Sequence, residues 1–164
     1  MARLVLSDAS PLIVFARLDG LDWLRALFGT VCLPAMVRTE ILDRGDWPGR
    51  EALRAALAAG WLQVRDDAIA APQLPDLDEG EAACIRLAIG HGEPVLILMD
   101  ERAGRAVAAE HGLAVAGTAA VIGMAKQHGL IPSARVVFEA LLKSDFRISR
   151  AAIQTVLERV GEAD

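Results

Sequence analysis

Aromatic residues are scarce in this chain: they make up 4% of the 164 residues, and tyrosine is absent. Apolar residues nevertheless account for 54%, so the core must be built from alanine, leucine, valine and isoleucine. Such a composition suits helices packed on a sheet, and this hydrophobicity excludes a disordered chain. The length is typical of one domain, and we expect residues 1–164 to form a single domain.

Cysteines and long apolar runs are also few. Cys32 and Cys84 stand in apolar surroundings without C-x-x-C spacing, which indicates buried free thiols. The longest uncharged apolar stretch, residues 95–99, is far below the about 20 residues of a membrane span. Asp8 interrupts the first apolar run too early for a signal peptide. We therefore expect a cytoplasmic protein without a membrane segment.

Lysine is nearly missing, with 2 lysines against 15 arginines, and the net charge is −5. This balance does not predict the basic surface of a typical nucleic-acid-binding protein. Two considerations weaken that objection. Carboxylates committed to a metal ion would inflate the acidic count, and arginine grips phosphate better than lysine does.

Short apolar strands alternate with helical segments along the chain. The expected strands cover residues 4–7, 30–33, 61–64, 94–99 and 113–116. The expected helices cover residues 12–18, 21–28, 34–44, 51–59, 78–90, 102–111, 118–128, 133–142 and 149–160, and residues 45–49 and 66–75 are expected to be loops. This α/β alternation predicts a three-layer αβα fold whose central sheet is mainly parallel and covered on both faces. The unbroken apolar run at 94–99 suits a central strand.

Four of the 22 acidic residues are placed differently from surface charges. Asp8 and Asp100 each follow directly from an apolar strand, and ligands of parallel sheets bind beyond the carboxyl ends of strands. Glu40 and Glu81 fall on or beside the apolar stripe of their helices. An ionised carboxylate on such a stripe is costly unless it is paired or binds a metal ion.

Glu81 and Glu40 also have structural explanations. Asp78 followed by Glu81 resembles a capping box, with Asp78 as the N-cap of a helix. Glu40 could form an ion pair with Arg38 or Arg44 on its own helix. Each of these alternatives stays open at the level of sequence.

The two strand-end residues have structural explanations as well. Asp8 could cap the helix that begins near Pro11, and Asp100 could cap the helix that begins near Arg102. These alternatives do not explain why all four carboxylates point toward the same end of the sheet. If they converge, their mutual repulsion requires protons or a cation, and oxygen ligands without histidine or cysteine favour Mg²⁺ or Mn²⁺.

The three histidines do not contribute to this cluster. His91, His111 and His128 lie near helix ends or in turns, where surface or C-capping roles are expected. No Walker A loop and no G-x-G-x-x-G motif follows a strand, which argues against a nucleotide cofactor. A phosphatase with Asp8 as nucleophile is disfavoured, because Ser10 stands where the Asp-x-Asp signature has its second acid.

Several short motifs, taken with their order and spacing, resemble one known family over nearly the whole chain. They are Asp-Ala-Ser-Pro-Leu at 8–12, Leu-Pro-x-x-Val-x-x-Glu at 33–40, Leu-Asp-x-Gly-Glu at 77–81, Asp-x-x-x-Gly-Arg-x-x-Ala at 100–108, Gly-Thr at 117–118 and Ala-Lys-x-x-Gly-Leu-Ile at 125–131. The opening motif resembles that of PIN domains, the nuclease fold of many bacterial toxins. The chain is more similar still to a PIN-related prokaryotic family usually left as a domain of unknown function.

The resemblance implies a PIN-like domain with a metal-dependent site. Asp8 matches the first acidic position, Glu40 the second and Asp100 the last. The third is commonly aspartate in the toxin branch, and here Glu81 is the closest match, with Asp78 a competing candidate.

The same resemblance implies a ribonuclease that uses Mg²⁺ or Mn²⁺ to activate water against RNA. Ser10 and Thr118 could hold water or a phosphate oxygen, or could be plain N-caps. Arg102 and Arg105 could contact the RNA backbone, or could lie on an exposed helix face. Relatives of this kind are toxins paired with small antitoxins, and we expect a homodimer.

A catalytically weak PIN-like module that binds nucleic acid or protein is the main alternative, and the net charge fits it. The final helix carries an apolar stripe formed by Ile148, Ala152, Ile153, Val156, Leu157 and Val160. That stripe either packs in the core or makes residues 133–160 a contact for a partner or second subunit.

Overall fold

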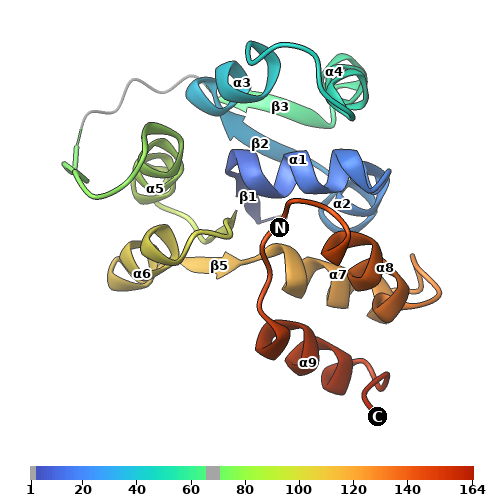
Figure 1. The fold of residues 1–164 in the computed structure, drawn as a ribbon. Coiled ribbons are helices and arrows are strands. Elements are labelled where there is room, and N and C mark those ends of the chain that lie inside the picture. The colour runs from blue at the N-terminus through green and yellow to red at the C-terminus, as the bar shows by residue number, and fades with distance from the viewer. Residues whose placement is uncertain (1–2, 66–70) are drawn as a thin grey trace.

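Five strands form one parallel sheet in the computed structural model, which describes residues 3–65 and 71–164. The strand order is β3-β2-β1-β4-β5 (Figure 1). The strands are β1 (Leu4–Ser7), β2 (Val31–Pro34), β3 (Leu62–Arg65), β4 (Val95–Leu98) and β5 (Ala114–Ala116). Every pairing between them is parallel, so the prediction of an α/β fold with a parallel sheet is confirmed.

The helices also appear where the sequence predicts them. They are α1 (Ala9–Arg17), α2 (Leu21–Phe28), α3 (Ala35–Leu42), α4 (Arg50–Ala59), α5 (Glu79–His91), α6 (Arg102–Glu110), α7 (Thr118–Gln127), α8 (Ala134–Leu142) and α9 (Arg150–Arg159). The first helix begins three residues earlier than expected, because Asp8 takes the N-cap position and Pro11 fits within the first turn. Of the expected loop at 66–75, residues 66–70 lie outside the described residues.

The helices cover the sheet in two layers. The α5 helix packs across β1, β2 and β4, and α6 packs against β5. Right-handed crossovers then place α1 to α4 on the opposite face. Helix α7 follows β5 and contacts α2 on that same side, and α8 and α9 pack on α7 (Figure 1). The result is the predicted three-layer arrangement.

Burial follows the expected pattern of a covered parallel sheet. All four residues of β2 and of β4 are buried, whereas the edge strands β3 and β5 are partly exposed. Cys32 and Cys84 are buried free thiols, as predicted. None of the helices in the described part of the chain is long and apolar enough to cross a membrane.

The apolar stripe of the last helix packs inward. Val156 and Leu157 are buried, and the helix lies so close to α7 that a Cβ at Gly123 would stand 2.9 Å from Val156 Cγ1. This outcome selects core packing from the two alternatives that the sequence left open.

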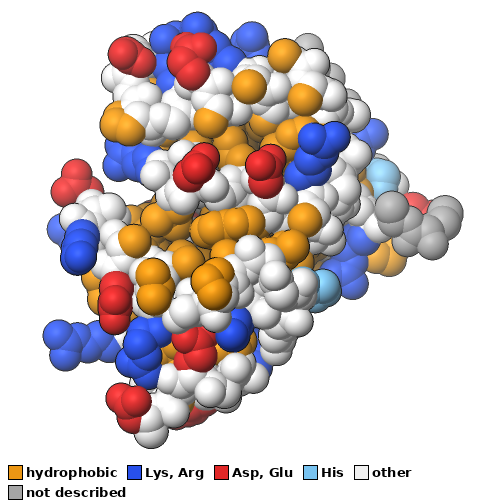
Figure 2. Space-filling view, turned by 90° about the vertical axis from the view of Figure 1, so that its right-hand side faces the viewer, with side chains coloured by type: hydrophobic (Ala, Val, Ile, Leu, Met, Phe, Trp, Pro, Cys, Tyr) orange, Lys and Arg blue, Asp and Glu red, His pale blue; other side chains and the backbone are white. Residues whose placement is uncertain are grey.

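Helix α8, by contrast, exposes the side chains of Val136 and Leu142. Figure 2 views the side of the molecule on which α8 lies and shows apolar side chains gathered in the middle of that face. That residues 133–160 take part in an oligomer, and that residues 1–164 form a single domain, stay predictions.

Candidate active site

Asp8 and Asp100 stand just beyond the carboxyl ends of the neighbouring strands β1 and β4. Ser7 pairs in register with Leu98, and the Asp8 amide donates a hydrogen bond to the Leu98 carbonyl at 3.0 Å. The chain order of the sheet reverses here, since β2 lies on one side of β1 and β4 on the other. Open parallel sheets bind their ligands in the crevice outside such a point.

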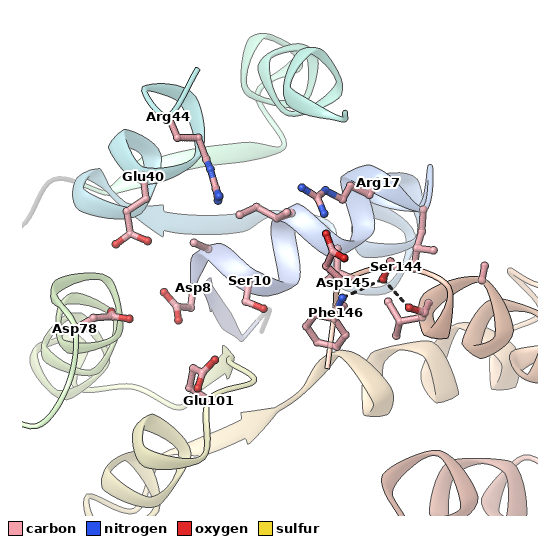
Figure 3. Close-up of a pocket in the computed structure, with 16 residues that line it drawn as sticks. Asp8, Ser10, Arg17, Glu40, Arg44, Asp78, Glu101, Ser144, Asp145 and Phe146 are labelled. Carbon is pink, nitrogen blue, oxygen red and sulfur yellow. Dashed lines mark hydrogen bonds between the residues drawn. The ribbon is translucent and has the colours of Figure 1, made fainter. Parts of the chain in front are cut away.

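A cavity of about 640 Å³ opens at this point beside Asp8. Glu40 reaches it from α3, Asp78 from the start of α5 and Glu101 from the start of α6. Figure 3 shows these four side chains around a shared space. We call it the acidic cavity. Glu101 was not among the predicted site residues, although its place directly after Asp100 at a strand end is a signal that could have identified it.

Two helix-interior glycines give these carboxylates room. A Cβ at Gly80 would lie 2.6 Å from Glu40 Oε1 and 3.1 Å from Asp8 Oδ1. A Cβ at Gly104 would lie 2.7 Å from Glu81 Oε2. Glycine inside a helix costs about 1 kcal/mol relative to alanine. Because no side chain fits at either position, these glycines are site residues that the sequence analysis used only as parts of motifs.

Asp78 and Glu81 form the start of α5 together. Asp78 is the N-cap, and its Oδ1 accepts a hydrogen bond from the Glu81 amide at 2.8 Å, which confirms the capping interpretation. Glu81 is only 5% exposed and lies against Gly104. Of the two candidates for the third acidic position, Asp78 is the one that lines the acidic cavity.

Burial and like charges act on the Asp8 carboxyl. Burial raises the pKa of Asp8 to about 7, although the nearby backbone N–H of Ala9 lowers it in part. The charges of Asp78, Glu40 and Asp100 raise it further. Asp8 takes the N-cap position of α1 but makes no side-chain capping hydrogen bond, so the capping alternative does not account for it.

The same forces act on the two glutamates. Burial and a side-chain hydrogen bond with Asp78 raise the pKa of Glu81 to about 8, and neighbouring acidic charges add to the shift. Burial and the charge of Asp78 raise the pKa of Glu40, while Arg44 lowers it. The acidic residues therefore disfavour one another's ionised forms.

The structure corrects two interpretations of Glu40. Its side chain is exposed at the edge of the acidic cavity and not on the buried stripe, which Val37 and Ile41 form. Within residues 3–65 and 71–164, the ion pairs are Arg54–Glu51 and Arg135–Asp164, so Glu40 pairs with neither arginine of its own helix. Burial therefore does not explain this carboxylate, and neither does an ion pair.

Asp100 is held by three hydrogen bonds. The Thr118 amide donates to its Oδ1 at 2.7 Å, and the Thr118 and Ser10 hydroxyls donate to its Oδ2 at 2.7 and 3.2 Å. The expectation that Asp100 caps the helix near Arg102 is wrong, because Glu101 is the N-cap of α6. Ser10 and Thr118 are not N-caps either; both orient Asp100.

The predicted arginines are exposed, as the alternative interpretation had it. Arg102 does not line the acidic cavity. Arg105 lies beside Asp100, since a Cβ at Gly117 would stand 3.2 Å from both Arg105 Nη1 and Asp100 Oδ1. Arg44, which the sequence analysis considered only as a partner of Glu40, lines the acidic cavity.

The donor set suits a hard divalent cation. Carboxylates and the Ser10 hydroxyl line the acidic cavity, with neither histidine nor cysteine among its lining residues. Oxygen donors of this kind favour Mg²⁺ or Mn²⁺. In the described part of the chain, no three acidic, histidine or cysteine side chains are already gathered closely enough to hold an ion. Mutual repulsion keeps carboxylates apart, so a cation would have to draw these side chains together.

Comparison with known proteins gives one match. The family model described as a PIN domain covers residues 4–162, which include the acidic cavity and every motif that resembles this family. No curated protein matches the chain in sequence. The match spans far more than half of the chain, and the protein therefore belongs to the PIN-domain family.

Proposed function

We propose that this protein is a metal-dependent ribonuclease that acts in the cytoplasm and hydrolyses phosphodiester bonds in RNA. PIN domains are nucleases as a class and generally use divalent metal ions. The observation that carries the proposal is the acidic cavity at the end of β1. There Asp8 is raised in pKa by three acidic neighbours, and no ion pair among the described residues neutralises the group.

The proposed ligands are Asp8, Glu40, Glu81 and Asp100, with Asp78 as the partner of Glu81. Asp8 is central, because the charges of Glu40, Asp78 and Asp100 all act on it. Asp78 and Glu81 share a hydrogen bond, and Asp78 is the member that faces the cavity. When bound, a divalent ion lowers the pKa of a water molecule and stabilises negative charge on phosphodiester oxygens.

The chain's own residues then have distinct tasks. Ser10 and Thr118 hold Asp100 in one orientation, so this carboxylate does not have to reorganise when substrate binds. Glu40 lies exposed at the edge of the cavity, where it is placed to orient the attacking water. Gly80 leaves the space in which Glu40 and Asp8 approach each other.

A binding module with little catalysis is the second candidate. The observation that favours it is that the acidic side chains are not gathered at metal-binding distance in the described residues. The net charge of −5 agrees with it. The two functions differ in whether metal binding leads to cleavage.

Asp8→Asn and Asp100→Asn test the ribonuclease. Each variant removes one charge of the proposed metal site and is expected to lower the cleavage of labelled single-stranded RNA by at least about 100-fold. Cleavage by the unaltered protein should require Mn²⁺ or Mg²⁺ and stop in EDTA. Asp22→Asn is the matched control, since Asp22 is exposed on α2 and lines no part of the acidic cavity.

Two results would contradict the proposal. Cleavage that persists in EDTA or in both variants would remove the carboxylate site from the reaction. Mn²⁺ binding by the unaltered protein without cleavage of any RNA offered would favour the binding module.

We also propose that the protein is the toxin of a toxin–antitoxin pair, with a small antitoxin protein as partner. The resemblance of its motifs to toxin nucleases supports this role. Expression of the unaltered chain alone should arrest bacterial growth, and Asp8→Asn should relieve the arrest, because the toxicity depends on RNA cleavage. Growth that is unaffected by the unaltered chain at matched protein levels would count against a toxin.

The metal-free protein should lose stability as the pH rises. In the unfolded chain Asp8 and Glu81 ionise near 3.8 and 4.5, whereas in the folded protein their pKa values are about 7 and about 8. The folded state keeps protons that the unfolded state releases, so stability present below about pH 4 is lost as the pH approaches 8. Thermal unfolding in EDTA between pH 4 and 8.5 measures this fall.

The fall should be shallower in Asp8→Asn, which has one carboxyl fewer to ionise, and unchanged in Asp22→Asn. Saturating Mn²⁺ should reduce it as well, because a cation stabilises the ionised carboxylates. An unaltered slope in both cases would show that the acidic cavity does not cause the pH dependence.

A further inference from the structure

A second cavity, of about 340 Å³, adjoins the acidic cavity. Three arginines from different parts of the chain line it: Arg105 from α6, Arg147 from the segment before α9 and Arg159 from α9. Asp100 lines it too. We call it the arginine cavity. It brings three guanidinium groups to one place in a chain whose net charge is −5.

The two cavities are continuous through shared residues. Phe146 lines both of them. Asp100 lines the arginine cavity and accepts a hydrogen bond from Ser10, which lines the acidic cavity. Figure 3 places Phe146 at the side of the acidic cavity away from Glu40 and Asp78. A linear ligand that extends from the acidic cavity past Phe146 therefore enters the arginine cavity.

The arginine cavity is strongly electropositive. Within residues 3–65 and 71–164, Arg105, Arg147 and Arg159 take part in no ion pair, since the pairs found there are those of Arg54 and Arg135. Ser149, the N-cap of α9, lines the cavity, so the positive end of that helix dipole adds to the potential. Guanidinium groups bind phosphate in a bidentate manner.

Phe146 supplies a different kind of contact. It is half-buried, and it lies between the arginines and the carboxylates. Proteins that bind single strands combine a positively charged groove with aromatic side chains on which bases stack. An acidic peptide would match the arginines but not the continuation into the acidic cavity, where a carboxylate-bearing chain is repelled.

We propose that the arginine cavity binds the phosphodiester backbone of single-stranded RNA next to the nucleotide in the acidic cavity, and that Phe146 stacks on a base between the two. This subsite rests on the proposed function, because it assumes that the RNA also occupies the acidic cavity. It explains how an acidic protein with a carboxylate site holds a polyanion: the anchoring charge lies beside the site and not in it.

Equilibrium binding of RNA tests the arginines. The probe is a labelled oligouridylate of about 12 nucleotides, whose fluorescence anisotropy is followed in EDTA so that no cleavage occurs. Arg147→Gln combined with Arg159→Gln should weaken binding at least about tenfold and lower the slope of log K against log salt by about 1.4 in magnitude. The matched control is Arg25→Gln with Arg54→Gln, which removes the same charge, and neither residue lines either cavity.

Phe146 is tested by two substitutions that keep an apolar side chain. Phe146→Leu should weaken binding about tenfold, because leucine packs but cannot stack on a base. Phe146→Trp should bind at least as tightly as the unaltered protein. Equal binding by the leucine and tryptophan variants would overturn the stacking role, and thermal unfolding checks that both variants are folded.

A small phosphodiester separates this proposal from the proposed function. Bis(4-nitrophenyl) phosphate is too short to reach the arginine cavity, so its cleavage with Mn²⁺ should be unchanged in the double arginine variant. If that variant binds the oligouridylate as tightly as its control, the subsite is refuted, whether or not cleavage occurs. If polyglutamate binding depends on these arginines and RNA binding does not, the cavity takes an acidic protein instead. Loss of RNA binding in a protein that cleaves neither substrate would support the subsite and refute the nuclease.

Discussion

Like charges crowd the carboxyl ends of β1 and β4, and much of the site can be understood from their repulsion. Two unit charges about 4 Å apart repel by about 4 kcal/mol at an effective dielectric of 20. Asp8, Glu40 and Glu81 all have raised pKa values, each with burial as the largest cause and with acidic neighbours adding to it. No ion pair in the described parts of the chain relieves this cluster. Such an arrangement costs free energy of folding, and proteins keep such costs mainly at functional sites.

The fold holds the cluster together in spite of that cost. A parallel sheet delivers Asp8 and Asp100 from adjacent strands, and the hydrogen bond between the Asp8 amide and the Leu98 carbonyl fixes their spacing. Glycines at 80 and 104 let α5 and α6 approach without steric conflict. Thr118 and Ser10 fix Asp100 from α7 and α1. Elements from both layers of helices thus converge on one edge of the sheet.

Sequence reasoning predicted what depends on local pattern. Apolar runs placed the strands, and strand ends placed Asp8 and Asp100, because parallel strands bring their carboxyl ends to one edge. It failed where the outcome depends on contacts distant in sequence. The hydrogen bond from Ser10 to Asp100 joins residues 90 positions apart, and helical periodicity alone placed Glu40 too close to the buried stripe. Arg147 and Arg159 carry no local signal, since only the docking of α9 on α7 brings them beside Asp100.

Diffraction from crystals grown in Mn²⁺, recorded at the manganese absorption edge, tests the central claim most directly. The account predicts an anomalous peak in the acidic cavity with Asp8, Glu40 and Asp100 around it, and with Asp78 nearer to the ion than Glu81. The carboxylates should have rotated toward the ion from the positions described here. A peak elsewhere, or an acidic cavity without a peak at saturating Mn²⁺, would contradict the claim that these residues form a metal site.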